Sequence, residues 1–177
     1  MHFETLLNWK NAQLKRSGQP EIWARPWVRA VLERTFAARE AHFSGVLFTM
    51  HAGERLVAAN FMLRSHGVMH DWVVAHDNAF DSYSPGLQLA RWAVGWAGDN
   101  GVAEVEFGIG DSQYKRQLST TQRMLEWGVV SGGSMSGALR RAVYAVRASL
   151  ERMPDTRIAA LPGKAMRRLD LMRALTA

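Results

Sequence analysis

The stretch Arg55-Leu-Val-Ala-Ala-Asn-Phe-Met-Leu-Arg64 decides the fold of this chain. It is an apolar run of strand length that follows the turn formers His51-Ala-Gly-Glu54 and precedes the tight turn His66-Gly67. Similar runs stand on either side of it, at residues 45–50 and 68–76. Strands joined by connections this short pair with their neighbours, so the sequence predicts an antiparallel meander of three strands.

Two helices are predicted before the meander. Residues 3–16 have apolar side chains at helical spacing, and Ser17-Gly18 ends the segment. Residues 26–39 form the second helix, and its predicted apolar stripe consists of Trp27, Val31, Leu32 and Phe36.

The segment after the meander predicts a helix, a strand, a short helix and a last strand. Ser84 is the expected N-cap and Pro85 the first residue of a helix that Gly101 ends, with an apolar stripe of Leu87, Ala90, Val94 and Ala97. A strand over 102–107, a short helix over 112–118 and a strand over 124–131 follow. The whole pattern predicts an α+β fold with a mixed, mainly antiparallel sheet flanked by helices.

Charge divides the chain in two. The formal net charge is +6, yet residues 1–135 carry 13 basic and 13 acidic side chains, so the whole excess lies in the tail. The tail is expected to form two basic amphipathic helices beyond Gly132-Gly133-Ser134. We therefore expect one domain over residues 1–133 and a basic helical extension over residues 134–177.

The tail helices also carry apolar stripes, which favour packing and a homodimer contact. A weak contact with an anionic membrane surface is a second interpretation. Contact with tRNA phosphates is a third and less favoured one.

Composition excludes several kinds of site. The chain has no cysteine, which rules out disulfides, a thiolate nucleophile and a cysteine-ligated metal, and no tight His and Asp cluster predicts another metal site. No apolar run is long enough to cross a bilayer, and the residues after Met1 do not resemble a signal segment. The expected location is the reducing cytoplasm.

Tyr83-Ser84-Pro85-Gly86-Leu87 is the first stretch suited to a site. A helix start offers unpaired N–H groups and a positive dipole end, which suit a pyrophosphate or carboxylate, and Gly86 allows close approach. An ordinary capped helix start explains the same residues and is favoured when they are taken alone.

The second stretch is Gly108-Ile-Gly110-Asp111, which directly follows a predicted strand, with Tyr114 and Lys115 on the short helix beyond it. Ligands of α/β sheets bind at the carboxyl ends of strands, and a lysine there can stabilise developing negative charge. The other interpretation makes Asp111 a helix cap, Tyr114 a packing residue and Lys115 part of a solvated face.

The third stretch is the last strand of the meander. Alternation predicts His70, Trp72 and His76 on one face of the sheet and Asp71 and Asp77 on the other. A histidine near a bound amine can act as a general base, although a packed histidine is the commoner case on a strand.

Taken in order, these pieces resemble the GNAT-like domain of the CelD (cellulose biosynthesis) group, which is related to the FemAB peptidyltransferases. The resemblance spans about residues 3–130 and rests on eight stretches: Leu7-x-Trp9-Lys10-x-x-Gln13, Ala24-Arg25-Pro26-Trp27, Phe43-x-Gly45-Val46-Leu47, Ala52-Gly53-x-Arg55-Leu56-Val57-Ala58-Ala59, Phe61-x-Leu63-Arg64-Ser65, Ala75-x-Asp77, Tyr83-Ser84-Pro85-Gly86-Leu87 and Gly108-x-Gly110-Asp111-x-x-Tyr114-Lys115.

This resemblance implies a GNAT-like sheet that splays open beside the third strand of the meander. It implies acyl-CoA, such as acetyl-CoA, as the donor, with pantetheine in the splay and pyrophosphate at Tyr83, Ser84, Pro85, Gly86 and Leu87. It also implies that Lys115 assists acyl transfer. Two departures stand out: Ser84-Pro85-Gly86 replaces the usual GNAT loop, and the strand that begins Asp71-Trp72 stands where relatives tend to have aromatic residues.

The resulting hypothesis is an N-acyltransferase in which an amine attacks the donor carbonyl directly in a ternary complex. Lys115 would stabilise charge, His76 or Asp77 would take the amine proton, and the expected acceptor-binding residues are Trp72, Asp111 and Tyr114. The acceptor would be a small-molecule or cell-envelope amine, in envelope or polysaccharide biosynthesis.

Two other functions stay open. One is a catalytically idle scaffold of a polysaccharide assembly system, and the other is a FemAB-like transferase that uses aminoacyl-tRNA. The chain is also expected to be the C-terminal half of a longer, two-lobed protein.

Overall fold

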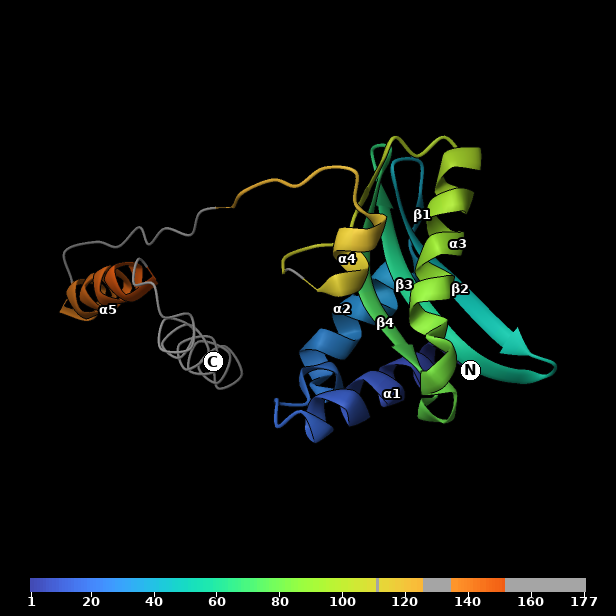
Figure 1. Cartoon of the computed structure of the whole chain (residues 1–177), viewed down its shortest axis with the longest axis horizontal. Helices are drawn as coiled ribbons and strands as arrows, with labels where there is room; N and C mark the ends of the chain where they lie inside the picture. Colours follow the sequence, from blue (N-terminus) through green and yellow to red (C-terminus); the bar gives the residue numbers. More distant parts are fainter. Residues whose placement is uncertain (111, 126–134, 152–177) are drawn as a thin grey trace. The chain divides into compact units, whose positions relative to one another are not determined.

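The computed structural model describes residues 1–110, 112–125 and 135–151 (Figure 1). The chain divides into two compact units, Met1–Thr121 and Gln122–Ala177.

The described part of the first unit contains a five-stranded sheet with the order β1-β2-β3-β4-β5. Its strands are β1 (Arg39–Glu40), β2 (Phe43–Ala52), β3 (Arg55–Ser65), β4 (Val68–His76) and β5 (Glu104–Glu106). The antiparallel meander is confirmed as β2, β3 and β4, because its turns hold Gly53 and Gly67 in the left-handed conformation that tight turns need. β5 runs parallel to β4, which makes the sheet mixed, as predicted.

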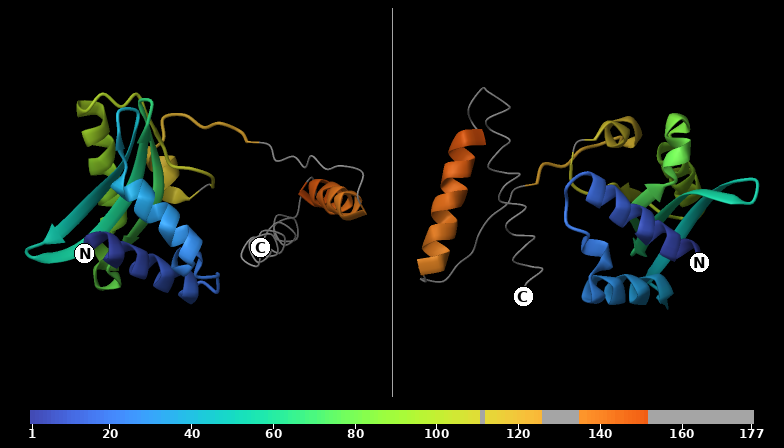
Figure 2. Two further views of the ribbon diagram at one scale, coloured as in Figure 1. Left: turned by 180° about the vertical axis from the view of Figure 1, so that it is seen from behind. Right: turned by 90° about the horizontal axis from the view of Figure 1, so that it is seen from below.

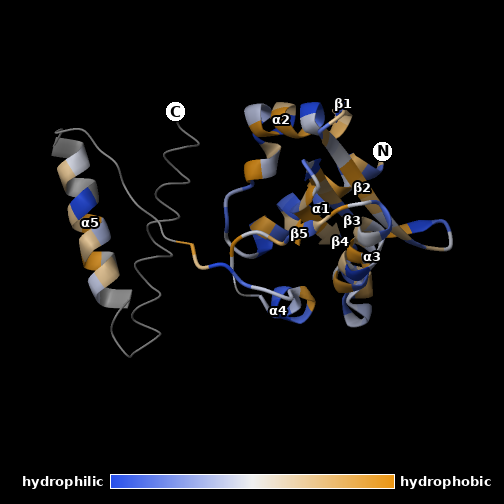
Figure 3. Cartoon of the chain, turned by 90° about the horizontal axis from the view of Figure 1, so that it is seen from above, coloured by the Kyte–Doolittle hydropathy of each residue, from blue (hydrophilic) through white to orange (hydrophobic). Residues whose placement is uncertain are grey.

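Helices cover both faces of this sheet (Figures 2 and 3). On one face lie α1 (His2–Arg16) and α2 (Pro26–Ala37), joined through the short helix η1 (Ile22–Ala24). On the other lie α3 (Pro85–Asp99), entered from η2 (Asn78–Tyr83), and α4 (Gln113–Leu118). The predicted α+β class is confirmed.

Each face has its own core. Phe61 and Val73 of the sheet are buried under α1 and α2, together with Leu6 of α1. Met62 and Met69 are buried against α3 on the opposite face. Each such side chain contributes about 1.5–3 kcal/mol by leaving water, so both faces of the sheet are firmly held by helices.

The apolar stripe predicted for α2 is partly wrong. Val28 and Leu32 are the buried residues, whereas Trp27 is 56% and Val31 45% exposed. Phe36 is partly buried, stacked on Phe3. Apolar residues lie on both sides of the true contact line, so spacing alone left the rotation of the helix open.

The stripe predicted for α3 is shifted in the same way. Ala90 and Ala97 are buried as expected, but Leu89 and Ala93 complete the buried face. Leu87 and Val94 are only half-buried at its border. Gly101 ends the helix with a φ of 69°, as predicted.

The last part of the chain is described only in pieces. Met124 and Leu125, which begin the predicted last strand, have no regular structure, and the rest of that strand lies outside the described residues. The first tail helix is α5 (Met135–Glu151), and the residues predicted for the second tail helix lie outside the described part, as does Gly132-Gly133-Ser134. Among the described residues, no helix is both long and apolar enough to span a bilayer.

Candidate active site where two strands part

The sheet opens where β4 and β5 part. The two strands pair over only three residues, Val68–His70 opposite Glu104–Glu106. An ion pair of 2.9 Å between His70 Nδ1 and Glu106 Oε2 joins the last rung. β5 then ends, while β4 continues to His76, so this edge of β4 has no strand partner among the described residues. Such an edge leaves backbone groups available to a ligand.

A β-bulge in β4 decides which side chains reach the opening. Met62 pairs with Asp71 and Phe61 with Val73, so Trp72 is the extra residue. The inserted residue reverses the alternation beyond it. The prediction that His70, Trp72 and His76 share one face is therefore wrong.

The faces follow from the partners on β3. Asp71 pairs with Met62 and His76 with Ala58, which stand on the α3 face, whereas His70 pairs with Leu63 of the opposite core. Trp72 is 42% exposed, and its ring meets that of Phe61 edge-on, with the centroids 6.5 Å apart.

Polar side chains from separate elements gather around Asp71. The Tyr114 hydroxyl of α4 lies 3.5 Å from Asp71 Oδ2, at the outer limit of a hydrogen bond. Lys10 of α1 and Lys115 of α4 both act on the carboxylate by their charge. The Asn60 amide of β3 also lies near enough to favour the ionised carboxylate.

Burial dominates the protonation of this group, which we call the Asp71 cluster (Lys10, Asn60, Asp71, Tyr114 and Lys115). Burial raises the pKa of Asp71 despite the amide and the two lysines. Burial, assisted by the Asp71 charge, raises the pKa of Tyr114 to about 12. Burial lowers the pKa of Lys10, and the charge of Asp71 opposes that shift. Three groups of the cluster are therefore biased toward their neutral forms.

Lys115 is held by the loop that precedes its helix. Its Nζ donates a 2.8 Å hydrogen bond to the carbonyl of Ile109. Gly108 and Gly110 turn that loop with φ values of 69° and 113°, which glycine adopts without strain. Ser112 occupies the N-cap position of α4, and the predicted site residue Asp111 lies outside the described residues.

The other two predicted catalytic residues lie at the far end of β4. His76 Nε2 is 2.7 Å from Asp81 Oδ1. Asp77 pairs with Arg55 at 2.6 Å and accepts a 3.0 Å hydrogen bond from the Ala79 amide. The amide bond and Arg55 lower the pKa of Asp77, which keeps it ionised and makes it a weaker base.

His76 and Asp77 line a small hollow of about 170 Å³, together with Trp9, Ala12, Arg16 and Asn78. Five residues of strand separate Asp71 from His76, which is roughly 16 Å at a rise of about 3.3 Å per residue. The structure therefore brings Tyr114 and Lys115 to the Asp71 cluster and leaves His76 and Asp77 at a second location.

The predicted donor-binding stretch forms the start of α3. Ser84 stands at the N-cap position with a left-handed φ of 49°, but its side chain makes no capping hydrogen bond. In the part of the chain that the structure describes, the Gly86 amide has no backbone partner, whereas Leu87 and Gln88 both donate to the Ser84 carbonyl. A Cβ at Gly86 would lie 3.5 Å from His76 Nδ1, so this glycine leaves room for close approach.

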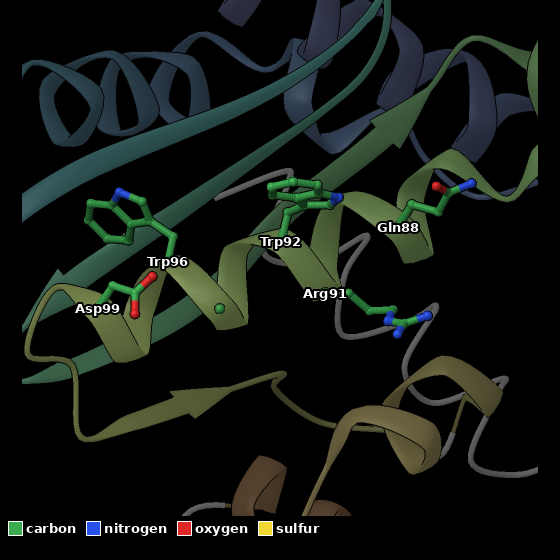
Figure 4. A pocket seen from close by; sticks show the side chains of 6 residues that line it. Gln88, Arg91, Trp92, Trp96 and Asp99 are labelled. Carbon is green, nitrogen blue, oxygen red and sulfur yellow. The ribbon is translucent and has the colours of Figure 1, made fainter.

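A larger open groove of about 510 Å³ runs along the outer side of α3 (Figure 4). It is lined by Gln88, Arg91, Trp92, Gly95, Trp96 and Asp99. It shares no residue with the Asp71 cluster, so size alone does not locate the chemistry.

Sequence reasoning missed Lys10 and Asn60 as site residues. Asn60 is the one polar residue within the apolar core of its run, a visible signal that a buried partner is required. Lys10 carries no such signal, because a lysine on a helix is normally solvated, and only the packing of α1 over β4 shows that its Nζ reaches the Val74 carbonyl at 3.2 Å.

Among the described residues, no group of three His, Asp or Glu side chains could hold a metal ion. No curated protein and no solved structure matches the chain significantly. A family model, described as an acetyltransferase (GNAT) domain, matches residues 2–116. That span contains the whole sheet, α1 to α3 and the first residues of α4. The chain therefore belongs to the GNAT acetyltransferase domain family.

Proposed function

We propose that this chain is an N-acyltransferase that moves an acyl group from acyl-CoA, such as acetyl-CoA, to an amine. The opening between β4 and β5 carries this proposal, because Asp71, Tyr114 and Lys115 gather beside it from different elements. The family match supports the class of chemistry.

The start of α3 is the proposed place for the donor's pyrophosphate. The absent side chain at Gly86 and its unpaired amide fit an anion at a helix N-terminus. Asp77 and Asp81 are anions close to this helix start, but Arg55 and His76 respectively are paired with them. The residues present therefore fit the group.

The reaction needs no covalent enzyme intermediate. The amine nitrogen forms a bond to the acyl carbonyl carbon, the carbon–sulfur bond breaks, and the thiolate of CoA takes up a proton after the amine has lost one. Lys115 is the cation proposed to stabilise the negative charge that develops on the carbonyl oxygen. His76 and Asp77 lie at the α3 end of β4, so we assign them to the donor end rather than to the amine.

An idle scaffold is the rival that Trp72 could support. An indole lying across the opening would block the donor, but the Trp72 ring contacts Phe61 on the α1 and α2 face. This contact favours the enzyme over the scaffold.

The finer expectations rest on the sequence resemblance alone. They are membership of the CelD and FemAB-like group, an envelope or polysaccharide amine as acceptor, a cytoplasmic location, a second lobe, and a dimer contact through the basic tail. An aminoacyl-tRNA donor stays the alternative to acyl-CoA.

A thermal-shift titration with CoA, acetyl-CoA and a long-chain acyl-CoA tests the donor site. A ligand that binds only the folded protein raises the melting temperature by mass action. We expect a saturable rise that is lost in Gly86→Asp, which places a carboxylate at the start of α3.

Gly98→Asp is the matched control, because it adds the same side chain to the same helix at a position with nothing within 4 Å. No shift with any of the three ligands would remove acyl-CoA as the donor. An equal loss in both variants would separate binding from the start of α3.

A further inference from the structure

The Asp71 cluster contains buried polar atoms with no partner. Asn60 is 0% exposed, and neither its Oδ1 nor its Nδ2 has a hydrogen-bond partner among the described residues. Asp71 Oδ1 is buried and unpartnered as well. The Asn60 amide is near enough to lower the pKa of Asp71, yet its geometry does not make a hydrogen bond.

Such atoms are costly, since an unsatisfied buried polar group loses about 1–3 kcal/mol and a charged one loses more. Native proteins seldom leave them so, and their usual explanation is a bound ligand, water or ion. Asp71 itself is only half-buried, so the cluster reaches the surface at the opening of the sheet.

Nearby lysines do not satisfy these atoms. Lys10 Nζ donates to the Val74 carbonyl, and Lys115 Nζ donates to the Ile109 carbonyl. No ion pair of Asp71 lies within 4.0 Å among the described side chains. The unpartnered set therefore offers a carboxylate oxygen and an amide oxygen as acceptors.

We infer that Asp71 and Asn60 form the acceptor subsite of this chain, and that they bind the ammonium group of a primary alkylamine. This inference rests on the proposed function and names its substrate class. An ammonium group has three N–H donors, which match two converging oxygens, and its charge pairs with the carboxylate. An anionic acceptor would instead meet the charge of Asp71.

The same contact prepares the amine for attack. An ammonium ion has no free electron pair, so it must first lose one proton. That proton passes from the ammonium nitrogen to Asp71 Oδ1, which leaves a neutral amine beside a carboxylic acid. The amine then attacks the acyl carbonyl, the thiolate of CoA leaves and is protonated, and Asp71 returns its proton to water. Burial suits Asp71 to this role because it favours the neutral acid.

Calorimetric titration of the full chain with n-butylammonium chloride tests the subsite, and n-butanol is the uncharged probe of similar shape. We expect saturable binding of the ammonium salt only, weakened at least tenfold in Asp71→Asn. Glu54→Gln is the control, since Glu54 is an exposed carboxylate in the turn between β2 and β3. It should bind as the wild type does.

A second measurement keeps an unfolded variant from deciding the matter. Removing an unpartnered buried charge should leave the melting temperature of ligand-free Asp71→Asn equal to or above that of the wild type, whereas a structural role predicts a fall. No saturable ammonium binding, equal binding of the two probes, or full binding by a folded Asp71→Asn would each overturn the inference. CoA binding is measured separately, so a retained CoA shift with failed amine binding rejects the subsite alone, and a lost CoA shift rejects the proposed function.

Discussion

At the scale of single residues, the Asp71 cluster shows how position on a sheet changes ordinary side chains. Asp71 and Tyr114 are held near neutrality by burial, and Lys10 is biased the same way from the opposite face. None of these shifts is encoded by the residue type, because each depends on neighbours from α1, β3 and α4. The chemistry of the site therefore belongs to its packing.

Asp71 should make folding stability depend on pH. Its pKa is raised in the folded protein, so ionisation costs stability only in the folded state. The cost is absent below the unfolded pKa of about 3.9 and is complete once the pH exceeds the raised folded value. Asn60 of β3, Lys10 of α1, and Tyr114 and Lys115 of α4 face the carboxyl and moderate the effect.

The free energy of unfolding, measured by urea titration between pH 4 and pH 7, checks this sign. Asp71→Asn should gain on the wild type as the pH rises through that window, because the amide cannot ionise. A difference that stays constant, or that narrows with rising pH, would show that burial does not govern this carboxyl.

At the scale of elements, turn chemistry made the meander predictable and pairing made its faces unpredictable. Gly53 and Gly67 fixed where β3 begins and β4 follows, so the strand bounds could be predicted to within a residue or two. The bulge at Trp72 is set by how β4 pairs with β3, and a single sequence holds no sign of it. One inserted residue moved Asp71 and His76 onto the same face.

Gly45 marks where α2 meets the sheet. A Cβ there would lie 2.4 Å from the Thr35 carbonyl oxygen and 2.9 Å from Phe36 Cα, both of them backbone atoms of α2. Gly45→Ala should therefore destabilise the fold by about 1–3 kcal/mol through overpacking. Urea unfolding monitored by circular dichroism measures the loss.

Gly95→Ala provides the opposite expectation for the same substitution. Nothing lies within 4 Å of a Cβ at Gly95, which is exposed in the middle of α3. Alanine should stabilise this helix by up to about 1 kcal/mol. If both variants shifted stability in the same direction, the close contact of α2 with β2 would not be the reason for Gly45.

At the scale of the whole molecule, the fold and the family lie in the first unit. Unit Met1–Thr121 contains the sheet and both cores, and the family match ends at residue 116. The basic tail supplies the whole net charge and lies beyond the family match. The α+β class could be predicted from periodicity, whereas the acceptor residues could not, because they meet only after α1 and α4 have docked on β4.

A chain ending at Thr121 should fold on its own, because no core residue of the sheet is removed. Its urea midpoint should stay close to that of the full chain. A chain ending at Asn100 is the matched control, since it lacks β5 and α4 and should unfold at a lower urea concentration. Loss of a cooperative transition in the longer fragment would mean that the tail is required for folding.

The transfer reaction itself tests the central claim most directly. The measurement is the rate of N-butylacetamide formation from acetyl-CoA and n-butylamine, counted together with the thiol released. The wild type should form one amide for each thiol, and Lys115→Met should be at least tenfold slower, as expected for the loss of a charge that stabilises an oxyanion. The neighbouring Arg116→Met should keep the wild-type rate. Thiol release without amide, or equal rates in the two lysine and arginine variants, would contradict acyl transfer at the opening between β4 and β5.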